Sequence, residues 1–255
     1  IVADGCKLAI LELNSICRIF TNSDPGQGIN ISDTPSRTRK LRDHKDDSYM
    51  ISKGKLIFYF DYIDPGSYLV DQLMDGLVVD KDKIILHPLE IRPPPLSRIN
   101  PSNPHWISYR DKVQQLAKES GLVLNDPTSP PWSRKAHELR LYAKDKGLEQ
   151  LIHKEIFKAH FCQGLDIGRI DMLVSIGINA GMNTSECKAT LDVDKYSHDI
   201  AQLGRAATDD GIKYTPVLRT EGDSLEGVAN IRELRKFLVR SGINVSMDIN
   251  NHFKS

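Results

Sequence analysis

The chain has 255 residues, of which 40% are hydrophobic and 27% charged, the composition of an ordinary globular protein. Lys plus Arg and Asp plus Glu both number 34, so the formal net charge is zero, and the basic surplus that nucleic-acid binding needs is missing. No apolar run approaches the roughly 20 residues that cross a bilayer, which excludes a membrane span. The cysteines have no paired spacing, which favours a reducing, cytoplasmic location; they are Cys6, Cys17, Cys162 and Cys187.

The first part of the chain differs in pattern from the rest. Thr21–Tyr49 is rich in polar residues and turn formers and has no sustained hydrophobic period. The first methionine is Met50, and a strand pattern follows it closely. We therefore expect residues 1–49 to be a tail outside the fold. The expected domain covers residues 50–242, and residues 243–255 are expected to form a C-terminal tail.

A strand, a helix and a second strand are predicted at the start of the domain. Leu56–Ile63 is a run of aromatic and β-branched residues, typical of a buried strand. The turn at Asp64–Ser67 breaks it, and an amphipathic helical stripe follows, formed by Val70, Leu73, Met74 and Leu77. Lys83–Leu89 is the second predicted strand. Because a helix separates the two strands, they are expected to pair in parallel as a βαβ unit.

A block of helices is predicted next, over about residues 104–208. Apolar residues recur at helical spacing in five segments, which are 109–117, 136–143, 148–159, 170–174 and 196–209. Gly181 is expected to end the fourth of these helices. Strand patterns return at Val217–Arg219 and Leu225–Gly227, and a last helix begins after Asn230, with Glu233 completing a capping box.

This order of elements resembles the thioredoxin fold with a helical insertion between its βαβ and ββα halves, an α/β fold class. The segment Phe58–Leu69 resembles the opening of the DsbA family, in the branch of FrnE-like proteins, 2-hydroxychromene-2-carboxylate isomerases and kappa-class glutathione transferases. Further segments agree with that branch in the same order, and they are 133–139, 157–161, 166–167, 180–182 and 211–217. In the family, the last of these carries a cis-proline, which corresponds to Pro216 here.

Both cysteines of the family's Cys-x-x-Cys motif are replaced in this chain. The resemblance places Asp64 and Ser67 at the two motif positions. Thiol–disulfide exchange requires a thiolate, so direct exchange at this loop is not expected. In the isomerase and kappa-class members a serine stands where Asp64 does and contacts the glutathione sulfur. Ser67, one helical turn away, is therefore the alternative hydroxyl for a glutathione-dependent isomerase or transferase.

The predicted site combines this loop with the proline segment. Ser67 and Asp64 are the candidate catalytic residues, and the candidate ligand-binding residues are Pro65, Gly66, Tyr68, Thr215 and Pro216. The main-chain groups of Thr215 are expected to pair with a small thiol, such as glutathione, or with an extended peptide. A third hypothesis is that the chain is a non-catalytic binding module, in which Asp64 and Pro65 only start a helix.

Two other groups of residues are of types that occur in metal or ligand sites. His153 and His160 are seven residues apart without a His-Glu-x-x-His pattern, so no metal site is predicted. Trp106 and Trp132 lie near helix starts in Pro-rich connections, where they either line a cleft between the insert and the core or pack. The oligomeric state is left open.

Overall fold

The computed structural model describes residues 54–125, 127 and 129–246. The expected tail at residues 1–49 lies outside the described residues. The first half of the fold is β1 (Leu56–Phe60), α2 (Pro65–Leu77) and β2 (Ile84–Pro88), with a short 3-10 turn, η2 (Lys81–Lys83), before β2. The helical block follows, with α3 (Pro104–Glu119), α4 (Arg134–Asp145), α5 (Glu149–Phe161), α6 (Ile170–Asn179), α7 (Thr184–Asp192) and α8 (Ser197–Asp209). The chain then forms β3 (Val217–Arg219), β4 (Ser224–Glu226) and α9 (Ile231–Arg240).

The four strands form one sheet in the order β2-β1-β3-β4. β1 pairs with β2 in parallel, as the βαβ pattern predicts, and with β3 in antiparallel orientation. Alternate residues of β1 face opposite sides of the sheet. Leu56, Phe58 and Phe60 belong to the main core, which includes α2 and α9, whereas Ile57 and Tyr59 pack in a second cluster with Ala207 of α8. Both faces of β1 are therefore covered, which explains its continuous apolar sequence.

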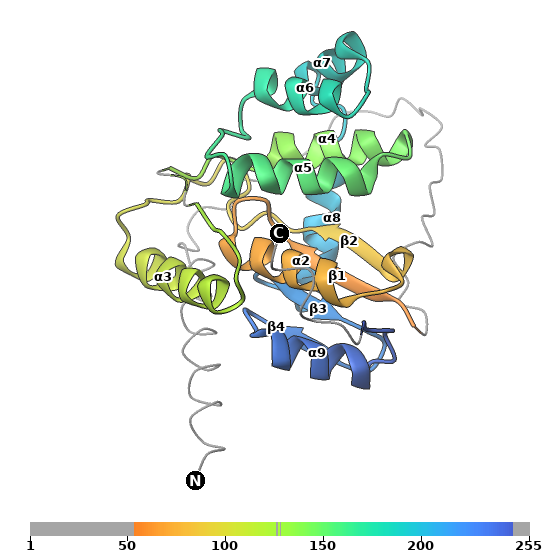
Figure 1. The fold of residues 1–255 in the computed structure, drawn as a ribbon. Coiled ribbons are helices and arrows are strands. Elements are labelled where there is room, and N and C mark those ends of the chain that lie inside the picture. The colour runs from red at the N-terminus through yellow and green to blue at the C-terminus, as the bar shows by residue number, and fades with distance from the viewer. Residues whose placement is uncertain (1–53, 126, 128, 247–255) are drawn as a thin grey trace, which may run out of the picture.

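The helical block is built around α4, which packs against α5, α6, α7 and α8. Figure 1 shows α4 and α5 side by side, with α6 and α7 beyond them and α9 beside β4, the strand at one edge of the sheet. α3 stands apart from this group and contacts α2. None of the helices in the described part is long and apolar enough to cross a membrane.

The structure differs from the expected elements in three places. β1 ends at Phe60, three residues earlier than expected, because the chain turns at Asp61–Asp64. The helix α7 was not predicted, since only Cys187, Thr190 and Leu191 of its nine residues are buried. Residues beyond the boundary expected at 242 also pack on the fold, because the N–H of Ser246 donates to the Leu77 carbonyl at 2.8 Å.

Candidate functional site

The site begins at the N-terminus of α2, which Asp64 caps. Its backbone is extended, with φ −91° and ψ 112°, and its carboxylate accepts from the N–H groups of Gly66 and Ser67 at 3.0 and 3.1 Å. Asp is among the preferred N-caps, and Pro65 at the first helical position has the φ that a helix requires. The capping role predicted for Asp64 and Pro65 is confirmed.

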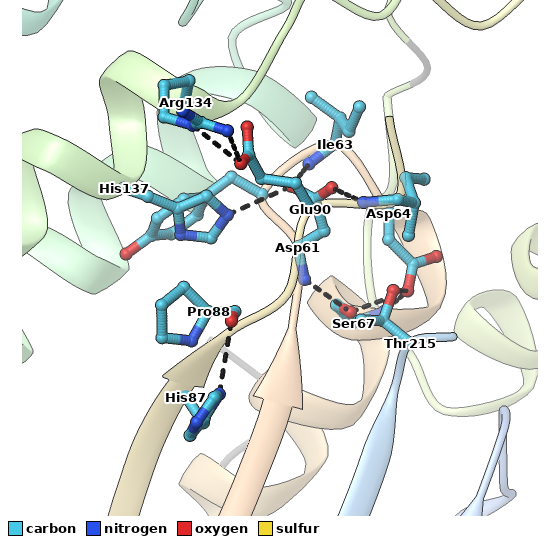
Figure 2. A network of polar contacts seen from close by, with 12 residues as sticks. Asp61, Ile63, Asp64, Ser67, His87, Pro88, Glu90, Arg134, His137 and Thr215 are labelled. Carbon is cyan, nitrogen blue, oxygen red and sulfur yellow. Dashed lines mark hydrogen bonds and ion pairs between the residues drawn. The ribbon is translucent and has the colours of Figure 1, made fainter. Parts of the chain in front are cut away.

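Three hydroxyl groups also donate to Asp64, and two of them come from distant parts of the chain. Ser67 Oγ and Thr215 Oγ1 lie 2.7 and 2.8 Å from Oδ2, and Tyr109 Oη lies 2.7 Å from Oδ1. Figure 2 shows Ser67 and Thr215 directed at the carboxylate. With the two backbone groups, five donors converge on two oxygens. Such an arrangement is suited to an ionised carboxylate, which only accepts hydrogen bonds.

Burial nevertheless makes the charge of Asp64 costly. Asp64 is 1% exposed, and this removal from water raises the pKa of its carboxyl to about 6. The hydrogen bonds from Ser67, Tyr109, Thr215 and Gly66 act in the opposite direction and favour the ionised form. The carboxyl group therefore titrates close to neutral pH while its oxygens are engaged within the protein.

The proline segment reaches α2 at Gly66. The Thr215–Pro216 peptide bond is cis. A methyl group on Gly66 would stand 2.2 Å from Tyr109 Oη, 2.8 Å from Val228 Cγ2 and 3.1 Å from Pro216 Cδ. Glycine is thus needed because α3, the proline segment and the start of α2 meet here without space for a side chain.

Replacing Gly66 with alanine is expected to lower the free energy of unfolding by about 1–3 kcal/mol, because the added methyl group overpacks this junction. Gly204 of α8 is the matched control, since a methyl group there meets nothing within 4 Å. Gly204→Ala is expected to raise stability by up to about 1 kcal/mol through helix propensity. Chemical denaturation of both variants checks this, and equal effects at the two positions would contradict the close packing at Gly66.

The structure brings most of the predicted site residues together, with one exception. Asp64, Ser67 and Thr215 form the hydrogen-bonded group described above. Tyr68, in contrast, is directed away from it, because its hydroxyl lies 3.2 Å from Cys162 Sγ and donates to the Val123 carbonyl at 3.3 Å. Sequence reasoning missed Tyr109 as a site residue. It was counted only in the apolar stripe of α3, and nothing in its local sequence indicates a contact 45 residues away.

A second polar network lies beside the first, around Asp61. Its side chain is fully buried, accepts from the Ile91 N–H at 2.7 Å and contacts His137 Nε2 at 3.3 Å. The Asp61 N–H donates to Ser67 Oγ at 3.3 Å, which joins the two networks (Figure 2). Burial lowers the pKa of His137, so its imidazole is neutral at pH 7.

Ser67 therefore has no hydroxyl group free for a ligand. Its side chain is fully buried. Its Oγ donates to Asp64 and accepts from the Asp61 N–H. Each of these bonds would have to be given up before Ser67 could contact a sulfur atom. The arrangement holds the start of α2 in place rather than presenting a nucleophile.

Comparison with known proteins identifies the family. The family model of the DsbA-like thioredoxin domain matches residues 55–239, and the chain belongs to that family. The Bacillus subtilis (strain 168) protein YwbO is 27% identical over 143 residues, which are 54% of this chain and 72% of that protein. This result confirms the family resemblance seen in the sequence.

Solved structures share the fold at low sequence identity. A probable DsbA oxidoreductase from Streptomyces coelicolor has a TM-score of 0.61 at 15% identity, over 74% of this chain and 89% of that one. The cytosolic disulfide reductase DsbM from Pseudomonas aeruginosa, solved with GSH, has a TM-score of 0.55 at 17% identity. The match covers 73% of this chain and 98% of that chain. A 2-hydroxychromene-2-carboxylate isomerase has a TM-score of 0.55 at 16% identity, and the match covers 73% of this chain and 93% of that chain. The thioredoxin-like fold class expected from the sequence is confirmed.

Proposed function

We propose that this chain is a binding module of the DsbA family that does not carry out dithiol–disulfide exchange at the start of α2. The observation that carries the proposal is the buried carboxylate of Asp64, engaged by five donors where the family has its first cysteine. Exchange proceeds through a mixed disulfide formed by a thiolate. Neither a carboxylate nor the Ser67 hydroxyl can form one.

The glutathione-dependent isomerase or transferase is the less favoured alternative. It would use Ser67, whose hydroxyl is buried and bonded to Asp64. An ionised Asp64 would also repel a thiolate brought close to it. The structural similarity to proteins described with GSH or as isomerases extends to the fold, and the residues at this position do not favour the same chemistry.

The main chain at Thr215 supports binding of an extended peptide or a small thiol. Neither the N–H nor the C=O of Thr215 makes a hydrogen bond to another residue that the structure describes. A buried main-chain group without a partner is costly, so a ligand that pairs with both groups gains affinity there. Pairing of this kind uses no particular side chain of the protein.

Access to Thr215 requires a change at α3. Thr215 is 3% exposed, and the Tyr109 hydroxyl approaches both Asp64 and Gly66 beside the proline segment. We infer that a ligand displaces Tyr109 when it reaches the main chain of Thr215.

The free thiols Cys162 and Cys187 agree with the reducing, cytoplasmic location that we propose.

Calorimetry with glutathione and with an unstructured peptide tests this proposal. Tyr109→Ala should bind the peptide more tightly than the parent, because the covering side chain is removed, whereas Thr215→Ala should bind as the parent does, because the main chain is kept. Asp64→Ser should increase affinity for glutathione by removing repulsion. Absence of binding by the parent and by all three variants would overturn the binding role.

A further inference from the structure

A cavity outside the Asp64 site lies between α8 and the connection that follows β2. Its volume is about 420 Å³, within the range of small-molecule sites. Arg134, the first residue of α4, lies in its wall. The connection after β2 contributes Leu89, Glu90, Pro93 and Pro94. Parts of the chain that are far apart in sequence thus enclose a space large enough for a small ligand.

One stripe of α8 faces this cavity. Its lining residues recur at a spacing of four in two adjacent rows, and they are Ile200, Ala201, Gly204, Arg205, Thr208 and Asp209. Residues four apart lie on the same face of a helix. The helix therefore presents a continuous surface to the cavity over more than two turns.

Gly204, in the middle of this stripe, leaves part of the cavity open. A methyl group on Gly204 would meet nothing within 4 Å in the described structure. Glycine in the interior of a helix lowers stability relative to alanine. Gly204 has neither a close contact nor a left-handed φ that would require glycine. What glycine provides at this position is space in the cavity.

The buried polar group of the cavity is the carboxylate of Glu90. Its side chain is 4% exposed. Arg134 donates to Oε2 from Nε at 2.7 Å, and its Nη2 lies 2.5 Å from the same oxygen (Figure 2). The other oxygen, Oε1, makes no hydrogen bond in the described structure. A buried acceptor without a donor is costly, so a ligand that donates to Oε1 gains affinity.

The charged residues that line the cavity balance one another. The Arg134 guanidinium neutralises Glu90, and Arg205 and Asp209 carry opposite charges one turn apart on α8. A cationic ligand at Glu90 would be repelled by Arg134, and an anionic ligand by the carboxylate itself. An uncharged molecule with an N–H or O–H group meets neither repulsion.

The rest of the wall is mainly apolar. Leu89 and Ile200 are 7% and 1% exposed, and Pro93, Pro94 and Ala201 line the cavity beside them. A ligand with an apolar body would therefore lose contact with water on entering.

We propose that this cavity binds a small, uncharged and mainly apolar molecule that has one hydrogen-bond donor. Its N–H or O–H donates to Glu90 Oε1, and its body lies over Gly204 against the apolar wall. The inference does not depend on the function proposed for the Asp64 site, because Asp64, Ser67 and Thr215 are not among the residues lining this cavity.

Calorimetry on the full chain with indole and benzofuran tests the hydrogen bond to Glu90. The two molecules have nearly the same shape, but only indole has an N–H group. We expect saturable binding of indole and at least about fivefold weaker binding of benzofuran. In Glu90→Gln this preference should be lost, because the amide oxygen pairs with Arg134 and an NH₂ group takes the place of Oε1. A preference that persists in Glu90→Gln, or tighter binding of benzylammonium than of indole, would overturn the assignment of the ligand.

Gly204→Leu tests where the ligand lies. The leucine side chain should fill the space over Gly204 and weaken binding of indole at least about tenfold. The melting temperature should not fall, because the space is open and leucine favours a helix more than glycine does. Gln202→Leu is the matched control, since Gln202 is exposed on α8 and does not line the cavity, and it should bind indole as the parent does. Unchanged binding in Gly204→Leu, equal weakening by both leucines, or no saturable binding of indole by the parent would overturn the site itself.

Discussion

The free energy of unfolding of Asp64→Ala is expected to be about 3 kcal/mol lower than that of Asp64→Asn. This corresponds to a melting temperature about 6–12 °C lower. Alanine removes the N-cap of α2 and leaves the buried hydroxyl groups of Ser67, Tyr109 and Thr215 without their acceptor. Asparagine keeps an acceptor oxygen for the cap and a polar partner for the hydroxyl groups. Chemical denaturation of both variants measures the difference. If they unfold alike, the hydrogen bonds at Asp64 do not hold the site together.

Comparison of the parent with Asp64→Asn also gives a pH dependence of stability with a defined sign. Burial raises the pKa of Asp64 to about 6 in the folded chain, above the ordinary value of 3.8. The folded state therefore binds the proton more tightly than the unfolded state does. The stability that this contributes is fully present below about pH 4, and it is lost as the pH rises through 6. Relative to Asp64→Asn, the parent should lose about 3 kcal/mol over that window. A constant difference from pH 4 to pH 8 would contradict the raised pKa.

Introducing two cysteines at residues 64 and 67 is expected to create the dithiol–disulfide exchange that we propose the parent does not carry out at this loop. In the variant with Asp64→Cys and Ser67→Cys, the first thiol would lie at the N-terminus of α2, where the helix dipole lowers its pKa and favours the thiolate. The hydroxyl groups of Thr215 and Tyr109 could donate to it in place of Asp64. Insulin reduction by this variant should exceed that of the parent at least about tenfold.

Two further variants control this experiment. Asp64→Cys alone should form a mixed disulfide without turnover, because the second thiol that releases the substrate is missing. Adding Tyr109→Ala to the double-cysteine variant should increase turnover further, since the Tyr109 hydroxyl lies against residues 64 and 66 of the loop. If the double-cysteine variant is inactive with and without Tyr109→Ala, the loop at residues 64–67 does not correspond to the motif of the family.

The sequence predicts the framework of the site but not how its groups are used. Asp64 and Pro65 have the chemistry of a helix start, and the order of strands brings Thr215 to the same end of the sheet as α2. The engagement of Ser67 by Asp64 was not predicted, because a hydroxyl one turn from a cap has the same sequence pattern whether it is free or bonded. The contact of Tyr109 depends on how α3 packs against α2, which no local pattern encodes.

Local sequence pattern is equally unable to predict the role of Trp132. A tryptophan in a Pro-rich connection indicates either packing or a binding surface, and the sequence alone does not choose between them. In the structure its Nε1 donates to the Leu96 carbonyl, and the ring stays 41% exposed and lines a cleft together with residues of the insert. Both are long-range features. They follow from how the insert folds back on the connection after β2.

Reduction of insulin by the parent chain, with glutathione as the electron donor, tests the central claim most directly. If Asp64 and Ser67 stand where the family has its two motif cysteines, as we propose, turnover should equal that of glutathione alone. It should also be unchanged when Cys162 and Cys187 are replaced by alanine. Turnover above that level that survives these two replacements but is lost in Ser67→Ala would contradict the account, since it would place exchange chemistry at the loop that Asp64 closes.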